Sequence, residues 1–368
     1  MGHINNGINK NIGAKTKIKR VGVLTSGGDA PGMNAAVRAI TRLALVKNIE
    51  VYGIYNGYQG LIDGEIKKLG ERDVSYIINR GGTMLYTARS DEFRTKEGLE
   101  KAADMCAKFG LDGVITIGGD GTFRGAVELT DTGVPCICIP GTIDNDIAST
   151  DATIGYDTAM NTVIEVVDKL RDTGESHARC NVVEVMGRDS GDIALNTAIA
   201  VGAICAVIKE FPTNFDKLFT KMIRARKNGK RNFIVITSEG IGSDYSEHLC
   251  EKINIKTGIE TRFVRPAHIQ RGGSPTLRDR VLATQMGCAA VESLVGGQMK
   301  RVVCLKGSGI MTMDIHEALY LDKMMKNTLS QSETDNIPPN ILYDMRRMVA
   351  DRLAYKSYLN YMITNIVL

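Results

Sequence analysis

The sequence predicts an α/β protein built from two lobes. Short apolar runs that are typical of buried strands alternate with amphipathic stretches typical of helices, which indicates mostly parallel sheets flanked by helices. Polar, glycine-rich segments follow several of these runs, where parallel α/β sheets bind their ligands. The 368 residues, of which 43% are apolar, suffice for two lobes. We therefore expect two Rossmann-like lobes with the active site in the cleft between them.

The first lobe is predicted from alternating strands and helices. Each apolar run lies next to a stretch of helical length, and the two differ in the spacing of their apolar residues. In chain order we expect a strand at 21–24, a helix at 34–46, a strand at 50–55 followed by an apolar segment around Leu61, a helix at 97–109, a strand at 113–117, a helix at 123–131 and a strand at 134–139.

A second series of elements begins near residue 156. It comprises helices at 158–170, 193–201 and 215–227, and strands at 181–185, 204–208 and 232–237. We expect the lobe boundary near residue 155 and a return of the chain to the first lobe near residue 268. The predicted lobes are therefore 19–155 plus about 268–318, and 156–267 plus about 319–330.

The two ends of the chain differ from the body. Residues 1–18 are predicted to be a disordered basic tail, since residues 1–20 carry five basic and no acidic residues. Residues 331–368 form an extension in which Pro338 and Pro339 precede apolar residues at helical spacing, at positions 341, 345, 348, 349 and 353. We expect this amphipathic helix to pack against the body or a partner subunit, with a membrane-surface helix as the alternative.

The charge and hydropathy exclude several classes of function. The formal net charge is +4, and it becomes −1 once the five basic residues of the tail are removed, so the body is not a general nucleic-acid binder. No apolar run approaches the roughly 20 residues that span a bilayer. The Asn-rich N-terminus does not resemble a secretory signal peptide. A cytoplasmic protein with no membrane or nucleic-acid partner is expected.

Two loops at the ends of predicted strands carry the strongest chemical signal. Glycines 118, 119 and 121 remove side chains from the first loop, so that backbone N–H groups can approach a phosphate, and Asp120 adds a carboxylate suited to Mg²⁺. The second loop presents a hydroxyl and two carboxylates, Thr142, Asp144 and Asp146. A phosphate cradle, a metal carboxylate and a candidate base together indicate phosphoryl transfer to an alcohol.

A third glycine-rich segment, Thr25–Asn34, lies between the first strand and the first helix. Its glycines allow backbone amides to line an anion site, to which the following helix adds its positive end. The segment lacks the Gly-Lys-Ser/Thr of a Walker loop and the spacing of a dinucleotide fingerprint.

Together these segments resemble the ATP-dependent 6-phosphofructokinases of the bacterial type, from about Lys19 to about Leu321. The resemblance is carried by six ordered motifs: Thr25–Asn34, Gly81–Thr83 with Ala88 and Arg89, Gly118–Thr122, Pro140–Asp146, Val185–Arg188 and His268–Pro275. It implies transfer of the γ-phosphate of ATP to O1 of fructose 6-phosphate, a committed step of glycolysis, with Mg²⁺, in a two-lobed homotetramer. The first lobe would bind nucleotide and the second the sugar phosphate.

The resemblance implies a role for each matched residue. Asp144 is similar to the general base, although a short acid in a turn can also serve only as a cap. Thr142 is similar to the hydroxyl that orients the transferred group and Asp120 to the Mg²⁺-associated acid. The implied catalytic residues are Asp144, Thr142, Arg188, Arg89 and Gly28. The implied ATP-binding residues are Gly27, Gly28, Tyr58, Arg89, Ser90, Gly119, Asp120, Gly121 and Thr122.

Arginines supply most of the positive charge in the implied sugar-phosphate site. Arg179 and Arg262 resemble the pair that reaches the 6-phosphate from a neighbouring subunit, with His268 and Arg271 supplied in cis, because planar guanidinium groups match phosphate geometry. The implied substrate-binding residues are Thr142, Ile143, Asp144, Asp146, Arg179, Met186, Gly187, Arg188, Glu239, Arg262, His268 and Arg271.

Donor choice and regulation depend on fewer residues. Pyrophosphate-dependent relatives typically carry Asp in place of Gly121 and Lys in place of Gly141, so glycine at both positions favours ATP. ADP or phosphoenolpyruvate is implied as an effector by a basic cluster, for which solvated helix charges are the alternative: Arg38, Arg42, Arg171, Lys230 and Arg231. Relatives usually have Lys or Arg in place of Asn228, and Ser90 stands where they often have Phe or Cys.

Three other functions stay open at this point. A pyrophosphate-dependent kinase and a kinase for a related sugar phosphate, such as sedoheptulose 7-phosphate, would use the same loops. A catalytically silent regulatory subunit would keep the fold but lose acids or arginines of the site. Asp120, Asp144 and Arg89 are all present, which favours an active enzyme. The basic N-terminus and the extension after residue 331 have no counterpart in the short bacterial form.

Overall fold

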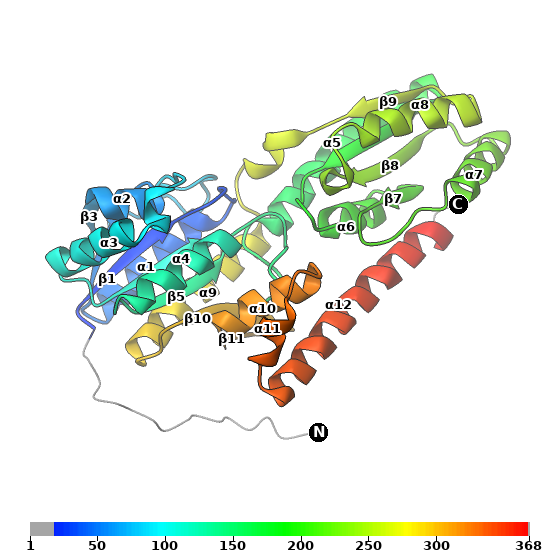
Figure 1. Cartoon of the computed structure of the whole chain (residues 1–368). Helices are drawn as coiled ribbons and strands as arrows, with labels where there is room; N and C mark the ends of the chain where they lie inside the picture. Colours follow the sequence, from blue (N-terminus) through cyan, green and yellow to red (C-terminus); the bar gives the residue numbers. More distant parts are fainter. Residues whose placement is uncertain (1–17, 367–368) are drawn as a thin grey trace.

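The protein folds into two lobes, each built around one sheet (Figure 1). The structure is a computed structural model and describes residues 18–366. The first sheet has seven strands in the order β11-β10-β5-β4-β1-β2-β3, and the second has four in the order β7-β8-β6-β9. The α/β class with mostly parallel sheets is therefore confirmed. The basic tail predicted for residues 1–18 lies almost wholly outside the described residues.

The first lobe is formed mainly by the N-terminal part of the chain. Its elements are β1 (Arg20–Thr25), α1 (Met33–Val46), β2 (Glu50–Ile54), α2 (Gly57–Asp63), β3 (Ile66–Leu69), η1 (Glu92–Arg94), α3 (Lys96–Phe109), β4 (Gly113–Gly118), α4 (Asp120–Asp131), β5 (Cys136–Pro140), α9 (Leu277–Val295), β10 (Arg301–Lys306), β11 (Gly309–Asp314) and α10 (Ile315–Met325).

The second lobe contains α5 (Tyr156–His177), β6 (Cys180–Val185), α6 (Asp192–Ala200), β7 (Cys205–Val207), α7 (Phe215–Lys227), β8 (Phe233–Ser238), η2 (Glu239–Ile241), α8 (Tyr245–Thr257), β9 (Thr261–Val264) and η3 (Ala267–Arg271). The chain then crosses back to α9. The extension forms α11 (Gln331–Asp335) and α12 (Pro339–Ile366), and α12 begins at the second of the two prolines.

The strands that sequence analysis did not foresee lie mostly at sheet edges. β3 and β11 pair antiparallel with their neighbours, whereas the strands between them run parallel. β3 has only four residues, and its two central lysines are exposed, so it lacks an apolar run. β4 and β5, by contrast, are buried along their whole length, because helices cover both faces of a parallel sheet.

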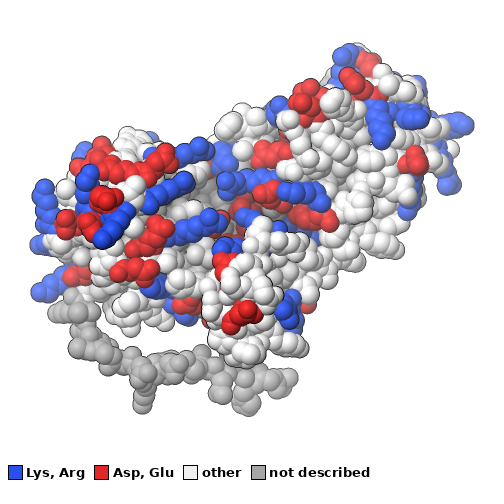
Figure 2. All heavy atoms as spheres, in the orientation of Figure 1, with Lys and Arg blue, Asp and Glu red and all other residues white. Residues whose placement is uncertain are grey.

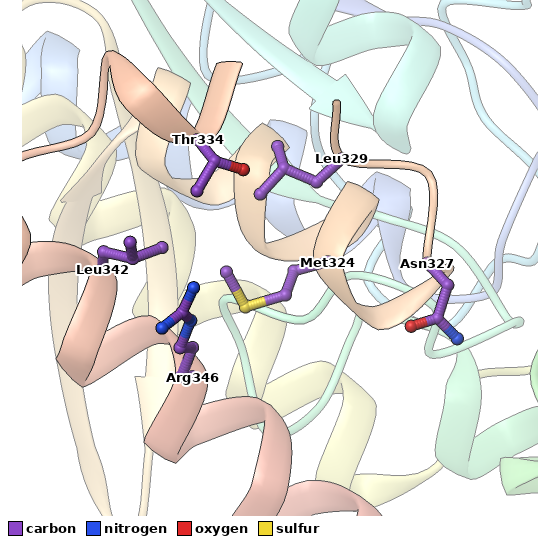
Figure 3. A pocket seen from close by; sticks show the side chains of 6 residues that line it. All are labelled: Met324, Asn327, Leu329, Thr334, Leu342 and Arg346. Atoms are coloured by element: carbon purple, nitrogen blue, oxygen red, sulfur yellow. The ribbon is translucent and has the colours of Figure 1, made fainter. Parts of the chain in front are cut away.

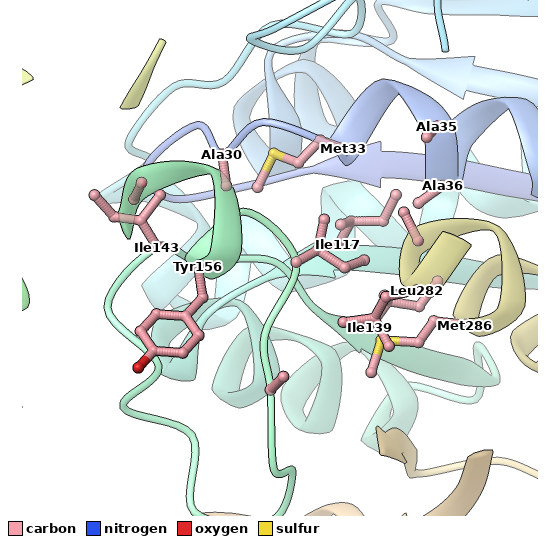
Figure 4. Packing of buried hydrophobic residues seen from close by; sticks show 14 of the residues in the cluster. Ala30, Met33, Ala35, Ala36, Ile117, Ile139, Ile143, Tyr156, Leu282 and Met286 are labelled. Atoms are coloured by element: carbon pink, nitrogen blue, oxygen red, sulfur yellow. The ribbon is translucent and has the colours of Figure 1, made fainter. Parts of the chain in front are cut away.

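The core of the first lobe lies directly behind the loops that end β4 and β5. Ile117 of β4 and Ile139 of β5 are fully buried and lie with Met33 of α1 and Met286 of α9 (Figure 4). α1 and α9 approach closely at Gly287, where a Cβ would lie 2.9 Å from the carbonyl oxygen of Ala36. This packing fixes the strand ends from which the polar loops project.

The C-terminal elements depart from the predicted lobe division. Residues of about 319–330 were expected in the second lobe, but α10 packs on α4, β10 and β11 of the first. α12 contacts α10 of the first lobe and α6 and β7 of the second, so it runs along both (Figure 1). The reason is the buried face of α10: Ile315 and Ala318 belong to a core cluster of the first lobe, and Leu321 packs with Ala148 and Met345.

The described surface carries both signs of charge. On the face shown in Figure 2, lysines and arginines alternate with aspartates and glutamates over both lobes. Among residues 18–366, no helix is both long and apolar enough to cross a bilayer.

Candidate active site

Two glycines shape the loop between β1 and α1. Gly27 has φ 86°, in the left-handed region, and its carbonyl oxygen accepts a hydrogen bond from Thr87 Oγ1 at 2.7 Å. A Cβ at Gly28 would lie only 2.7 Å from Nη1 of Arg271. The guanidinium of Arg271 therefore covers this loop, and positive charge is concentrated over bare backbone.

The loop between β4 and α4 combines one packed glycine with two open ones. A Cβ at Gly118 would lie 2.2 Å from Thr122 Oγ1, so packing requires glycine there. At Gly119 and Gly121 a Cβ would meet no atom of the described part of the chain within 4 Å. The space in front of both glycines is free for a ligand, and the first N–H groups of α4 border it, as in other anion-binding helix starts.

Asp120 is the first residue of α4 and is held in an ion pair. Arg124 donates Nη2 to Asp120 Oδ2 at 2.7 Å and Nε to Oδ1 at 3.1 Å. Asp120 also lines a cavity of about 310 Å³ with Asp322, Lys323 and other residues. A single carboxylate beside an open phosphate cradle fits Mg²⁺, which takes one or two protein carboxylates and otherwise keeps water and substrate phosphate oxygens.

Three residues that were expected to bind ATP use their polar groups within the protein. Thr122 donates its hydroxyl to the carbonyl oxygen of Ser26 at 3.1 Å, and Tyr58 donates its own to the carbonyl oxygen of Thr122 at 2.7 Å. The Tyr58 ring is 6% exposed and stacks on Phe93 at 4.1 Å between centroids. Ser90 donates to Gln59 Oε1 at 2.7 Å. Tyr58 and Thr122 thus support the start of α4 from behind, whereas Arg89 is exposed.

The β5 loop presents Asp144 as a buried carboxyl group. The residue is 3% exposed, and its Oδ1 has no hydrogen-bond partner among residues 18–366. Burial and the charge of Asp146 raise its pKa from 3.8 to about 6, although Arg271 and Arg188 act in the opposite direction. Thr142 Oγ1 accepts from the backbone N–H of Asp144 at 3.2 Å and fixes the turn, while Ile143 is buried in the core.

The loop after β6 brings the second lobe to Asp144. Gly187 and Arg188 both have positive φ, and their N–H groups donate to Glu239 Oε1 at 3.1 and 2.8 Å. The N–H of Met186 donates to Gln270 Oε1 at 3.2 Å. Glu239 therefore holds the backbone that carries Arg188, an arginine close enough to lower the pKa of Asp144. Sequence analysis predicted Glu239 as a substrate-binding residue and did not predict these hydrogen bonds to the backbone.

The remaining sugar-phosphate candidates fall into two groups on the second lobe. Arg179 and Arg262 both pair with Glu260, at 3.0 and 2.6 Å. His268 and Arg271 lie on η3; His268 is exposed, and Arg271 Nη1 donates to the carbonyl oxygen of Asp29 in the first lobe at 3.3 Å. Within one chain, the two arginines that were expected to act on a neighbouring subunit are therefore both ion-paired with Glu260.

The basic residues expected to bind an effector are divided between the lobes. Arg38 and Arg42 belong to α1, whereas Arg171 belongs to α5. Arg231 donates to the carbonyl oxygens of Glu175 and Ser176 at 3.1 and 3.2 Å, and the Lys230 ammonium lies 5.9 Å from the Phe233 ring centroid. An effector site formed from all five would have to combine surfaces of both lobes or of two subunits.

Sequence analysis missed two residues that bear on the acids of the site. Lys326 lies 3.5 Å from Asp146 Oδ2. Asp322 is 3% exposed and accepts the N–H of Ala148 at 2.6 Å. Burial, Asp120 and Asp146 raise the pKa of Asp322 to about 8. Both residues are more than 170 positions from their partners, and local spacing gives no signal for such contacts.

Asp322→Asn is expected to flatten the dependence of stability on pH. The ordinary pKa is 3.8, so between about pH 4 and 8 the folded state holds a proton that the unfolded state has released, and the free energy of unfolding falls as the pH rises. Asparagine keeps the acceptor for Ala148 and removes this titration. Melting temperatures at pH 5 and 8 measure the effect. Exposed Asp344→Asn is the matched control, and an unchanged pH slope in Asp322→Asn would contradict the assignment.

The fold and the candidate site fit a phosphotransferase that works between two α/β lobes, with open glycine loops facing a buried carboxyl group. The chain belongs to the phosphofructokinase family, since the model of that family, Phosphofructokinase, matches residues 20–294. This confirms the resemblance.

Similar proteins carry consistent names. The ATP-dependent 6-phosphofructokinase of Bacillus pumilus is 52% identical over 315 residues, which are 86% of this chain and 97% of that protein. That of Clostridium botulinum (strain Hall) is 51% identical over 85% of this chain and 97% of its own length. The solved structure of phosphofructokinase from Saccharomyces cerevisiae has a TM-score of 0.81 at 32% identity, covering 91% of this chain and 50% of that one.

Proposed function

We propose that this protein is an ATP-dependent 6-phosphofructokinase of the cytoplasm, which converts ATP and fructose 6-phosphate into ADP and fructose 1,6-bisphosphate in glycolysis. The observation that carries the proposal is Asp144, a buried carboxyl group between the glycine loops and Arg188, one oxygen of which has no hydrogen-bond partner within residues 18–366. The names of relatives about half identical over nearly their whole length support the same reaction.

Asp144 acts as the general base in this proposal. The sugar O1 attacks the γ-phosphorus, its proton passes to Asp144, and the bond from the γ-phosphorus to the oxygen it shares with the β-phosphate breaks to release ADP. A pKa of about 6 leaves the group ionised near neutral pH yet basic enough to accept a proton during attack. Arg188 and Arg89 balance the negative charge of the transferred group, which is usually a large part of catalysis.

ATP would lie along the loops of Gly27, Gly28, Gly119 and Gly121, whose missing side chains leave the backbone accessible. Asp120 would hold Mg²⁺ together with the phosphates of ATP, after exchanging its ion pair with Arg124. When bound, the ion neutralises charge on the β- and γ-phosphates. Asp120 needs no second protein carboxylate for this role.

The sugar phosphate would lie against the second lobe. Glu239 and Met186 would border the sugar, with Asp146 beside it, and His268 and Arg271 would approach the 6-phosphate from the same chain. Arg179 and Arg262 would come from the neighbouring subunit of a homotetramer. ADP or phosphoenolpyruvate would act as effectors between subunits, on the basic residues of α1 and of the second lobe.

Position 121 favours ATP over pyrophosphate as donor. The open space at Gly121 is not needed for packing, so it is available to a longer polyphosphate. Gly141 gives no such argument, because a Cβ there would lie 2.9 Å from Ile117 in the core. Packing alone therefore accounts for glycine at that position.

Steady-state assays of the purified protein separate the candidate reactions. We expect ATP with fructose 6-phosphate to give the highest kcat/KM among the four pairs formed by ATP or pyrophosphate with fructose 6-phosphate or sedoheptulose 7-phosphate. Faster turnover with pyrophosphate or with the larger sugar would favour the corresponding alternative. The absence of turnover with every pair would favour a silent subunit.

Mixed oligomers test whether subunits share active sites. Asp144→Asn and Arg262→Ala chains, each inactive alone, are expected to regain activity when dissociated and reassembled together, because roughly one quarter of the sites then combine two intact contributions by random pairing. Mixing Asp144→Asn with Arg188→Ala is the control. Both residues belong to one chain's site, so no activity should return. If the first mixture stays inactive, Arg262 does not act across a subunit boundary.

A further inference from the structure

Helix α12 connects the two lobes at the back of the catalytic loop. Near its start, Met345 is buried and packs in one cluster with Ala148 and Leu321 of the first lobe. Near its end, Leu359 and Ile363 are buried in the large core, and Thr364 accepts a hydrogen bond from Lys221 of α7 at 3.0 Å. Arg346 faces a separate hollow of about 280 Å³ between α10 and α12 (Figure 3).

Arg352, in the middle of α12, forms hydrogen bonds with the loop that contains Asp144. Its Nη1 donates to the carbonyl oxygens of Ile147 and Thr150 at 3.0 and 3.1 Å. Its Nη2 donates to the carbonyl oxygen of Asn145 at 2.6 Å and to Asp192 Oδ2 at 3.2 Å. One guanidinium, whose side chain is 17% exposed, thus binds three carbonyl groups of the first lobe and one carboxylate of the second.

Lys356 lies one turn further along the same face of α12 and holds the second lobe. Its ammonium contacts Ser190 Oγ at 3.2 Å, Glu210 Oε1 at 2.9 Å and Asp192 Oδ1 at 3.3 Å, and the residue is 2% exposed. Asp192 is therefore shared between Arg352 and Lys356. A lysine buried to this degree requires such partners.

The residue next to the proposed base is the one most constrained by these contacts. Asn145 has φ 51°, in the left-handed region, and its side chain reaches across to Asp192 Oδ2 at 3.4 Å. Its carbonyl oxygen accepts the shortest of the four bonds from Arg352. The conformation that directs Asp144 towards Arg188 is thus fixed from behind by α12.

We infer that Arg352 and Lys356 are positioning residues for phosphoryl transfer, which set the catalytic loop against the second lobe. The inference rests on the proposed function of Asp144 as base. Both side chains line one cavity with Asp146, but their polar atoms contact the Asn145–Thr150 loop, Ser190, Asp192 and Glu210, so we assign their effect to the loop and α6. Lysine cannot replace Arg352, since an ammonium lacks the fork that reaches several carbonyl oxygens in fixed directions.

Arg352→Ala is expected to lower kcat at least tenfold while the dissociation constant for ATP, measured by calorimetry, changes less than twofold. Among the described residues, the hydrogen bonds between α12 and the two lobes go to the Asp144 loop, Ser190, Asp192, Glu210 and Lys221, and none goes to the glycine loops that would hold ATP. Free guanidinium ion at millimolar concentration is expected to restore part of the lost kcat, because a cavity of about 430 Å³ borders Arg352 and Lys356 and admits the ion. Lys356→Met should also lower kcat, and guanidinium should not restore it.

Arg346→Ala is the matched control, because it removes an arginine from the same helix on a face that does not reach the loop. Its kcat should stay within twofold of the parent. A kcat within twofold of the parent in folded Arg352→Ala, or a loss that guanidinium does not reverse at all, would overturn the inference. If Arg352→Ala does not fold, the test uses Arg352→Lys instead. An undiminished kcat in that variant would likewise overturn the inference. An inactive parent protein would instead count against the proposed function.

Discussion

Asp144→Asn is expected to lower kcat by about 10²- to 10⁴-fold, the usual contribution of a positioned general base. Asparagine has nearly the same shape but cannot accept the proton of the sugar hydroxyl. Asp144 belongs to the β5 loop and not to the glycine loops that would bind ATP, so the ATP dissociation constant should change little. Single-turnover rates and ATP binding, measured on the same preparation, separate the two effects.

The pH dependence of the parent enzyme gives an independent check of the same carboxyl group. With a pKa of about 6, Asp144 is protonated at lower pH, so kcat should fall as the pH drops through 6. Its ionisation also costs stability. The shift from 3.8 to about 6 corresponds to up to about 3 kcal/mol at neutral pH, so Asp144→Asn should melt no lower than the parent. Retained turnover in Asp144→Asn would rule out this base.

Gly121→Asp is expected to lower kcat/KM for ATP by about 10²- to 10³-fold, since two like charges about 4 Å apart near a protein surface repel by about 4 kcal/mol. A Cβ at this position meets no atom of residues 18–366 within 4 Å, so the fold should tolerate the change. An acid in the first turn of α4 is also favourable for the helix. The loss should therefore lie in nucleotide binding and not in folding.

Gly121→Ala is the control for the added carboxylate, because it fills part of the same space without charge. We expect it to lower kcat/KM for ATP much less than Gly121→Asp does. Turnover with pyrophosphate should be measured for both variants. Equal losses in the two would show that bulk, and not charge, matters at position 121. Unchanged ATP turnover in Gly121→Asp would mean that ATP does not bind beside this loop.

The sequence was sufficient for the fold class and for locating the loops of the candidate site, because of how parallel sheets are buried. In parallel sheets, strands such as β4 and β5 are buried on both faces and read as continuous apolar runs, so their ends can be located. The carboxyl ends of neighbouring strands then bring Gly121 and Asp144 to one edge. The amphipathic helix after Pro338 could be located for a similar reason, because its apolar residues recur at helical spacing.

What could not be predicted depends on contacts between distant parts of the chain. Arg352 meets Asn145 across 207 positions, and Asp322 meets Ala148 across 174. Local patterns do not encode such pairings. In a helix of mixed polarity, Arg352 is indistinguishable from the exposed Arg347. Tyr58 shows the same difficulty, since only the structure reveals that its hydroxyl supports Thr122 from inside the lobe.

Phosphorus NMR of the reaction of ATP with fructose 6-phosphate labelled with ¹³C at C1 tests the central claim most directly. We predict that the γ-phosphate signal disappears while ADP and one new phosphate ester appear, with the new ester resonance split by coupling to the labelled carbon. Release of inorganic phosphate without a new ester, or an ester that lacks this coupling, would contradict phosphoryl transfer to O1.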